Sequence, residues 1–95
     1  MADREIVVLD GEKMISRREA HNHLAEQLAL PEYYGRNLDA LYDLLTERAG
    51  PTRIVIRRGN TLVSWLGDYG KSLIQTMLDA DRANPGLEVL FDKDE

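Results

Sequence analysis

Three short, mainly apolar runs, the first two rich in β-branched residues, limit the folds open to this chain: residues 6–9, 54–56 and 87–91. We read the first run as a strand buried on both faces and the second as another buried strand, because a continuous apolar run has no polar face to turn towards water. The longer stretches between the runs carry apolar residues at helical spacing. Short apolar strands separated by helices are typical of a parallel sheet with helical cover.

The stretch after the first run contains signals for a helix. Ser16 and Glu19 fit a capping box, in which the hydroxyl and the carboxylate bind free amides at a helix start. Apolar residues follow at helical spacing at Ala20, Leu24 and Leu28. Because a proline disfavours helical conformation in the residue before it, Pro31 predicts that this helix stops near Leu30.

A second helix is predicted to begin at Asn37, a favourable N-cap residue, and to end at Gly50-Pro51. On a helical wheel its leucines cluster on one side: Leu38, Leu41, Leu44 and Leu45. Polar residues and one tyrosine fall on the other side: Asp39, Tyr42, Asp43, Thr46 and Glu47. This pattern predicts an amphipathic helix with an acidic outer side.

Two further helices are predicted between the second and third runs. The shorter, capped by Asn60 or Thr61, carries four apolar residues: Leu62, Val63, Trp65 and Leu66. The longer covers about residues 70–83 and ends at Asn84-Pro85-Gly86. Asp81 projects towards the apolar side of this helix, so either the helix ends earlier or Asp81 lies at its edge. The element order is β-α-α-β-α-α-β, an α/β fold of one three-stranded sheet, with residues 92–95 as a frayed acidic tail.

Length, charge and cysteine content exclude several classes of protein. With 95 residues, the chain is expected to form a single domain over residues 1–95. Its 12 basic and 17 acidic residues give a net charge of −5, which repels nucleic acid and attracts a basic partner. The absence of cysteine rules out disulfides, thiolate zinc sites and a cysteine nucleophile, and it suits a reducing cytoplasm. No apolar run approaches the ~20 residues of a membrane span, and residues 1–5 do not resemble a secretion signal.

Candidate catalytic and metal-binding residues are few. His21 and His23 lie two apart on a helix and point about 200° apart, so they cannot share a metal, and we expect both at the surface. Ser16 serves as a cap, Ser64 has no Ser-His-Asp context, and the glycines form no phosphate-binding loop. We therefore expect no metal and no cofactor.

Asp39 and Asp43 lie four residues apart on one face of the second helix. Such a pair can hydrolyse glycosides, although a short chain has little room for a deep sugar cleft, and it can also be an ordinary solvated face. Three tyrosines surround the pair: Tyr33, Tyr34 and Tyr42. Gly35 allows a close backbone approach, and residues 38–47 contain no Lys or Arg. Unpaired carboxylates edged by tyrosines predict a recognition surface for a cationic partner.

The run LALPEYYGRNLDALYD at residues 28–43 resembles the signature of the barstar family. Members of this family are small cytoplasmic inhibitors of microbial ribonucleases. Their fold is a three-stranded parallel sheet with helices packed against it, which agrees with the element order read above. They insert an acidic helix and the preceding loop into the ribonuclease active site, so the resemblance implies a protein that is not an enzyme.

The resemblance implies a set of partner-binding residues in and after the signature: Tyr33, Gly35, Asn37, Asp39, Tyr42, Asp43 and Thr46. It makes Asp43 the central anchor, whose carboxylate stands where a substrate phosphate lies and meets the Arg, Lys and His side chains that bind it. In the longer helix, Asp79 aligns with a glutamate that contacts the enzyme in the best-known member, and Thr76 lies beside it.

Four positions depart from the best-known member of the family. Tyr42 and Arg48 stand where that member has tryptophan. Arg36 stands where it has an acid, and Asp79 where it has glutamate. These departures leave the identity of the cognate ribonuclease open. The Gly50-Pro51 bond falls near a proline that is cis in that member, and the sequence leaves its isomer open.

The sequence therefore predicts a cytoplasmic inhibitor of a basic extracellular ribonuclease of the barnase type, monomeric when free and without nucleic-acid or membrane partners. Two other functions stay open. One is an acidic adaptor that binds another basic protein, and the other, less favoured, is a small hydrolase that uses Asp39 and Asp43. An RNA-cleavage assay separates the first function from the others, because an inhibitor slows the enzyme stoichiometrically and turns nothing over.

Overall fold

The computed structural model describes residues 4–92 of the chain, so residues 93–95 of the predicted tail lie outside the described residues. The elements are β1 (Glu5–Asp10), η1 (Gly11–Lys13), α1 (Arg17–Gln27), α2 (Leu38–Thr46), β2 (Thr52–Arg57), α3 (Gly59–Leu66), α4 (Asp68–Ala83) and β3 (Leu87–Phe91). The predicted order β-α-α-β-α-α-β is confirmed. The short 3-10 helix η1, which the sequence reading missed, follows β1 directly.

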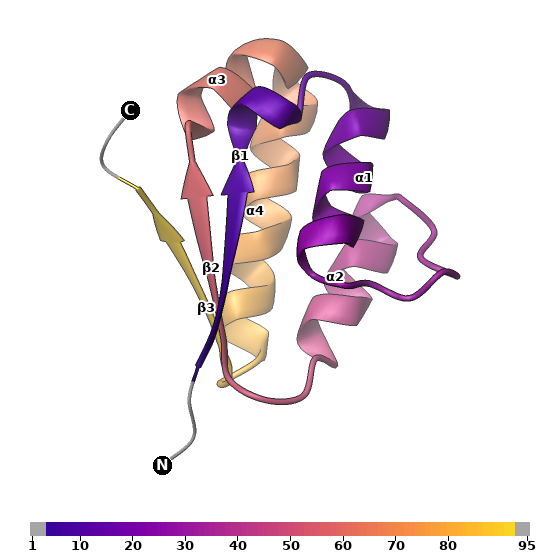
Figure 1. The fold of residues 1–95 in the computed structure, drawn as a ribbon, viewed down its shortest axis with the longest axis vertical. Helices are drawn as coiled ribbons and strands as arrows, with labels where there is room; N and C mark the ends of the chain where they lie inside the picture. Colours follow the sequence, from indigo (N-terminus) through magenta and orange to yellow (C-terminus); the bar gives the residue numbers. More distant parts are fainter. Residues whose placement is uncertain (1–3, 93–95) are drawn as a thin grey trace.

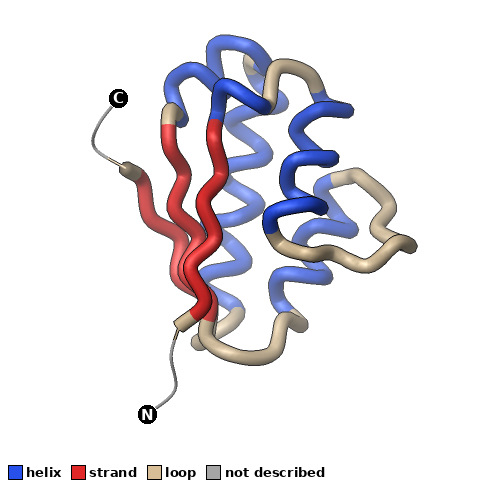
Figure 2. The backbone as a smooth tube through the Cα atoms, in the orientation of Figure 1, coloured by secondary structure: helices blue, strands red, loops and turns tan. Residues whose placement is uncertain are grey.

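The three strands form one parallel sheet in the order β1-β2-β3. In the register of the sheet, Ile54 on the central strand pairs with Val7 and Val89 on its two neighbours. Helices α1, α2 and α4 lie together on one side of the sheet (Figure 1). Figure 2 shows the same two layers, with the strands in red and the helices in blue.

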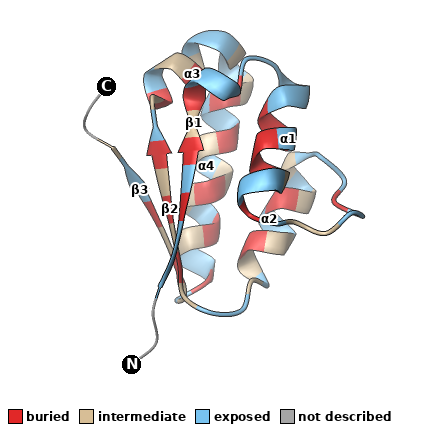
Figure 3. Ribbon diagram, in the orientation of Figure 1, coloured by how far each residue is buried: buried red, intermediate tan, exposed pale blue. Residues whose placement is uncertain are grey.

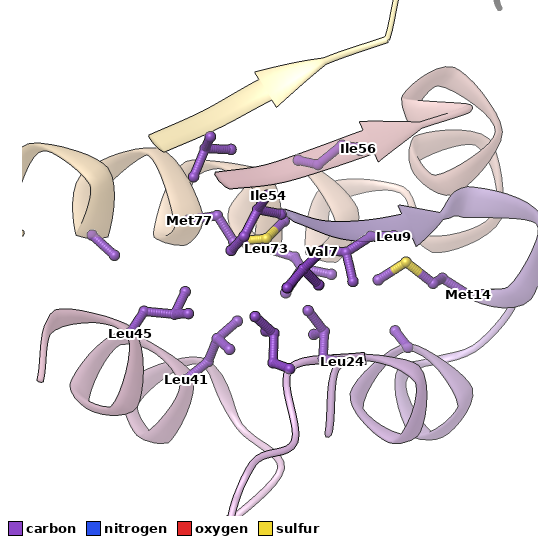
Figure 4. Close-up of a cluster of buried hydrophobic side chains, with 14 of the residues drawn as sticks. Val7, Leu9, Met14, Leu24, Leu41, Leu45, Ile54, Ile56, Leu73 and Met77 are labelled. Atoms are coloured by element: carbon purple, nitrogen blue, oxygen red, sulfur yellow. The ribbon is translucent and has the colours of Figure 1, made fainter. Parts of the chain in front are cut away.

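The hydrophobic core fills the space between the sheet and this helical layer (Figure 4). The strands contribute Val7, Leu9, Ile54 and Ile56, and the helices contribute Leu24, Leu41, Leu45, Leu73 and Met77. The core side of α2 therefore consists of the leucines that the sequence pattern assigned to it. Its opposite side is left for the solvent.

The other face of the sheet carries no helix in the described part of the chain, as the exposed positions on the strands in Figure 3 show. Along β1, Val7 and Leu9 are buried, whereas Ile6 and Val8 are 62% and 40% exposed. The prediction that the first strand is buried on both faces is therefore wrong. All of the covering helices pack on the same face, so alternate residues of the strand meet water.

Ion pairs extend across this uncovered face. Arg53 Nε lies 2.8 Å from Glu88 Oε1 on the adjacent strand, and Arg4 pairs with the same carboxylate. Arg57 Nε lies 3.3 Å from Asp92 Oδ2. The Asp92 amide also donates to the Ile56 carbonyl at 3.0 Å. The expected fraying therefore does not apply to Asp92, which continues the pairing at the edge of the sheet.

Some predicted helix boundaries shift in the structure. Helix α1 ends at Gln27 rather than near Leu30, because Ala29 adopts a positive φ of 52° and breaks the helical path. Helix α4 begins at Asp68, slightly before the predicted start.

The short helix α3 differs in its start and in one side chain. It begins at Gly59, after Arg58 with a φ of 54° and without a side-chain cap, so the predicted cap at Asn60 or Thr61 is wrong. Trp65, which the sequence reading grouped with the apolar residues of this helix, is 59% exposed. Leu62 is the residue of that group that is fully buried.

Asp81 has a structural role at the edge of the sheet. Helix α4 continues past it to Ala83. Its Oδ2 accepts a hydrogen bond of 2.8 Å from the Val89 amide. An earlier helix end is therefore excluded, and the half-buried Asp81 lies at the edge of the apolar side of α4, the other predicted possibility. Its carboxylate satisfies an amide of β3, an edge strand in the described sheet.

The described residues contain no cis peptide bond, so Gly50-Pro51 is trans. None of the helices within residues 4–92 is long and apolar enough to cross a membrane.

Candidate functional site

The loop between α1 and α2, residues 28–37, extends away from the sheet beside both helices (Figure 2). Two adjacent tyrosines in this loop have opposite environments. Tyr34 is 4% exposed, and its amide donates to the Pro31 carbonyl at 3.0 Å. Tyr33 is 80% exposed. The loop is therefore held by one tyrosine and presents the other to solvent.

Tyr34 is fixed by a buried histidine. His21 Nδ1 lies 2.5 Å from the Tyr34 hydroxyl, and His21 Nε2 lies 2.6 Å from the hydroxyl of Tyr69 on α4. Burial is the main cause that lowers the pKa of His21, and the positive charge of Arg36 lowers it further. Burial raises the pKa of Tyr34. A neutral imidazole has one donor and one acceptor nitrogen, so one tyrosine donates to His21 and the other accepts from it.

Both histidines were expected at the surface, and this prediction is wrong. His21 and His23 are 2% and 7% exposed. His23 Nε2 accepts a hydrogen bond of 3.0 Å from the Asp10 amide. The bend of the chain into η1 brings this amide to α1. The two histidines do point in different directions, as their spacing predicts. The spacing does not show that each side chain meets a hydrogen-bond partner in the interior.

Asn37 joins the loop to α2. Its Oδ1 accepts from the Ala40 amide at 2.8 Å, which confirms the predicted N-cap. Its Nδ2 donates to the Gly35 carbonyl at 3.2 Å. A side chain at Gly35 would place its Cβ 3.1 Å from Asn37 Nδ2. A side chain at this position would therefore crowd the cap of α2.

The outer side of α2 carries three exposed carboxylates, Asp39, Asp43 and Glu47, which we call the acidic stripe. Their spacing of four residues places successive carboxylates along one side of the helix. Within residues 4–92, every ion pair uses other acidic side chains. The acidic stripe therefore has no neutralising partner inside the described protein.

A pocket of about 240 Å³ opens beside the acidic stripe. Its lining includes Tyr33 and Gly35 from the loop, Asp43 from α2 and Glu47, the C-cap residue of α2. The structure thus brings together three of the predicted partner-binding residues. Glu47 was not among those residues, although its position one turn after Asp43 on the same side of the helix was a signal for it.

Other predicted partner-binding residues lie outside this pocket. Asp39 and Tyr42 are exposed on α2. Thr46 is half-buried, and its hydroxyl donates to the Asp43 carbonyl at 3.0 Å.

Two of the predicted partner-binding residues, Thr76 and Asp79, belong to α4, which packs against α2. The Thr76 hydroxyl donates to the Ser72 carbonyl at 2.8 Å. Asp79 Oδ1 accepts from Gln75 Nε2 at 2.9 Å. Both side chains are thus bonded within their own helix, and neither lines the pocket beside the acidic stripe.

Arg36 and Arg48, two of the departures from the best-known member, form hydrogen bonds within this protein. Arg36 has a φ of 52°, and its Nε donates to Asn22 Oδ1 on α1 at 2.9 Å. Arg48 donates to the Leu28 carbonyl and to Glu5 Oε1, each at 2.9 Å. Arg48 therefore ties the end of α2 to the start of the loop and to β1.

The described residues contain no group of three or more histidine, cysteine or acidic side chains that could hold a metal ion. The pocket beside the acidic stripe includes Asp43 but not Asp39, the other carboxylate of the hydrolase hypothesis.

Comparisons with known proteins add to this geometry. A family model described as "Barstar (barnase inhibitor)" matches residues 4–92. The chain is also similar to a protein of Bacillus subtilis (strain 168) named "Putative ribonuclease inhibitor YrdF". The two are 32% identical over 75 residues, which cover 78% of this chain and 82% of the relative.

Proposed function

Because this chain belongs to the barstar family, we propose that it is a non-catalytic inhibitor of a microbial ribonuclease. The family match and the name of the Bacillus subtilis relative support the general role. The more specific parts of the proposal are the mode of binding, a basic secreted enzyme of the barnase type as partner, and action in the cytoplasm before that enzyme is exported.

The proposed mode of binding is supported by the acidic stripe, which lies next to a loop with the exposed side chain of Tyr33. Asp43 and Glu47 share a pocket with Tyr33, and the described protein supplies no cation to the stripe. A ribonuclease keeps basic side chains for the phosphate of its substrate. A carboxylate that replaces the phosphate forms charge-assisted hydrogen bonds with them.

In this proposal Asp43 is the central anchor in the enzyme's phosphate site. Tyr33 and Tyr42 supply rigid aromatic contact area around it. Gly35 and Asn37 hold the loop in one conformation, which lowers the entropy lost on binding. Four residues make further contacts with the enzyme: Asp39, Thr46, Thr76 and Asp79.

The proposal is tested by RNA cleavage with barnase as the probe enzyme and the purified chain as titrant. We expect cleavage to fall linearly with added chain until the two proteins are equimolar. The chain alone should release no product. Turnover of RNA or of oligosaccharides by the chain alone would instead support a hydrolase. Binding to barnase without loss of cleavage would support an adaptor.

Two variants separate specific occlusion from general charge attraction. Asp43→Ala should strongly weaken inhibition. Glu26→Ala removes an exposed carboxylate of α1 that does not line the pocket beside the acidic stripe, so this variant should inhibit like the parent. Equal loss of inhibition in both variants would show that only net charge matters and would contradict the proposed site.

A further inference from the structure

A second pocket shares no lining residue with the pocket beside the acidic stripe. It lies between the first turn of α1, Arg36 in the loop and Tyr69 near the start of α4. Its volume of about 400 Å³ falls within the range of about 300–1,000 Å³ that is usual for small-molecule sites. Of its lining residues, the proposed function uses only Asn37, which holds the loop.

The pocket concentrates positive charge in an acidic protein. Arg17, Arg18 and Arg36 all line it, and its described lining contains no carboxylate. The ion pairs within residues 4–92 use other basic side chains. Three guanidinium groups thus share one concave surface without an internal counter-charge, although the whole chain has a net charge of −5.

The position of two of these arginines is unfavourable for the isolated helix. Arg17 and Arg18 open α1, where the helix dipole already contributes partial positive charge. Cations in a first turn destabilise a helix, and a third cation nearby adds repulsion. Glu19, the acidic residue of this first turn, offsets part of the charge but does not line the pocket. A bound anion removes this repulsion and interacts favourably with the helix terminus at the same time.

Two of the guanidinium groups are already held in place. The Arg17 guanidinium carbon lies 4.2 Å from the centre of the Tyr69 ring. Arg36 is bonded through Nε to Asn22 Oδ1 at 2.9 Å, and its Nη1 donates to the Tyr34 carbonyl at 3.5 Å. Arginine has five N–H donors, so each group keeps donors free for a ligand. Fixing the side chains in advance reduces the entropy that binding costs.

We propose that this arginine pocket, defined by Arg17, Arg18 and Arg36, binds the phosphate group of a small anion. Guanidinium groups match phosphate oxygens with paired hydrogen bonds, which the compact ammonium of lysine does not provide. The pocket is an open concavity of a size that fits a small ligand. The negative charge of the remaining protein surface disfavours an extended nucleic acid.

The full chain, labelled with ¹⁵N, provides the test. It is titrated with inorganic phosphate, adenosine monophosphate and adenosine while sodium chloride keeps the ionic strength constant. We expect saturable shifts of the amides around Arg17, Arg18 and Arg36 with the first two ligands and none with adenosine. Tighter binding of adenosine monophosphate identifies a nucleotide as the ligand, whereas equal binding identifies phosphate alone. A short RNA without terminal phosphate that binds the same amides more tightly would overturn the proposal of a small anion.

Substitution of the lining arginines tests whether phosphate binds in this pocket. Arg18→Gln removes a guanidinium group from the lining and should weaken phosphate binding about tenfold, the effect of losing one charge-assisted hydrogen bond. Arg36→Gln should weaken binding similarly, and a thermal melt reports whether the loop stays folded. Arg82→Gln is the matched control, because Arg82 is an exposed arginine in the last turn of α4. Shifts that stay linear with phosphate, or equal binding by all three variants, would overturn the proposal.

Discussion

The Asp43 carboxylate contributes little to the stability of the free protein. It is exposed at mid-helix, lines the pocket with Tyr33 and Glu47, and has no cation within the described residues. Glu47, one turn away on the same helix, adds mild repulsion. A partner that supplies cations would relieve this repulsion and bury the carboxylate with its charge compensated.

We predict that Asp43→Ala weakens binding to barnase by at least about 2–5 kcal/mol, because the cations of the enzyme would be left buried and unpaired. Tyr33→Ala and Tyr42→Ala should cost less, through lost packing. Binding isotherms measure these losses, and thermal melts of the free variants accompany them. Binding of Asp43→Ala within a factor of two of the parent, or unfolding of the variant, would contradict the anchor role.

His23 makes stability depend on pH. Burial is the main cause that lowers its pKa from the usual 6.5, and the positive charge of Lys13 lowers it further. Its Nε2 must also be unprotonated to accept the hydrogen bond from the Asp10 amide. The unfolded chain therefore takes up a proton first as the pH falls, and stability is lost below the unfolded-state pKa.

We predict that the free energy of unfolding decreases between pH 7.5 and 5.5, by up to about 1.4 kcal/mol per pH unit for each such histidine. Urea unfolding at the two pH values measures this change. His23→Gln should reduce the pH dependence, and the remaining part belongs to His21, whose pKa is also lowered. A parent protein equally stable at both values would show that the buried histidines do not titrate differently on folding.

At the scale of elements, the loop and α2 behave as one unit because a single side chain serves both. Asn37 caps the helix through Oδ1 and binds the Gly35 carbonyl through Nδ2. At the other end of α2, Arg48 binds the start of the loop. Asn84 Nδ2 donates to the Leu45 carbonyl at 2.9 Å and ties the end of α4 to the same helix.

We predict that Asn37→Ala lowers the free energy of unfolding by about 0.5–2 kcal/mol, the usual cost of losing an N-cap. It should also weaken inhibition, because the loop loses its bond to the helix. Asn37→Ser keeps a capping oxygen but not the bond to Gly35. Compared with Asn37→Ala, the Asn37→Ser variant should therefore recover most of the free energy of unfolding, measured by chemical denaturation, but less of the inhibition. Full recovery of inhibition with serine would show that the loop needs no support from this side chain.

At the scale of the whole molecule, the charges are unevenly distributed. The acidic stripe follows the outer side of α2, while the arginine pocket lies at the start of α1. The uncovered face of the sheet carries paired charges, which largely cancel. An approaching basic enzyme is therefore attracted mainly towards α2 rather than uniformly to the surface.

We predict that association with barnase is steered electrostatically. Steered encounters reach about 10⁸–10⁹ M⁻¹s⁻¹ at low salt and slow as salt screens the field. Stopped-flow measurements from low to high ionic strength should show this decline. Asp39→Asn and Glu47→Gln should reduce the rate at low salt and make it less dependent on salt. A rate constant that does not respond to salt would contradict steering by the acidic stripe.

Local patterns in the sequence determined the strands, the helices and the acidic side of α2. Each of these depends on spacing within one element, as for Leu41 and Leu45 against Asp39 and Asp43. The caps at Ser16 and Asn37 were predictable for the same reason, because their bonds reach only to Glu19 and Ala40.

Only the tertiary structure decided which apolar and polar groups are covered. Ile6 and Val8 are as apolar as their buried neighbours, yet they meet water because every covering helix packs on the opposite face of the sheet. His21 is buried because Tyr34 and Tyr69 reach it from other parts of the chain. Periodicity within an element shows which side is apolar, but burial and hydrogen bonding depend on which distant element packs there.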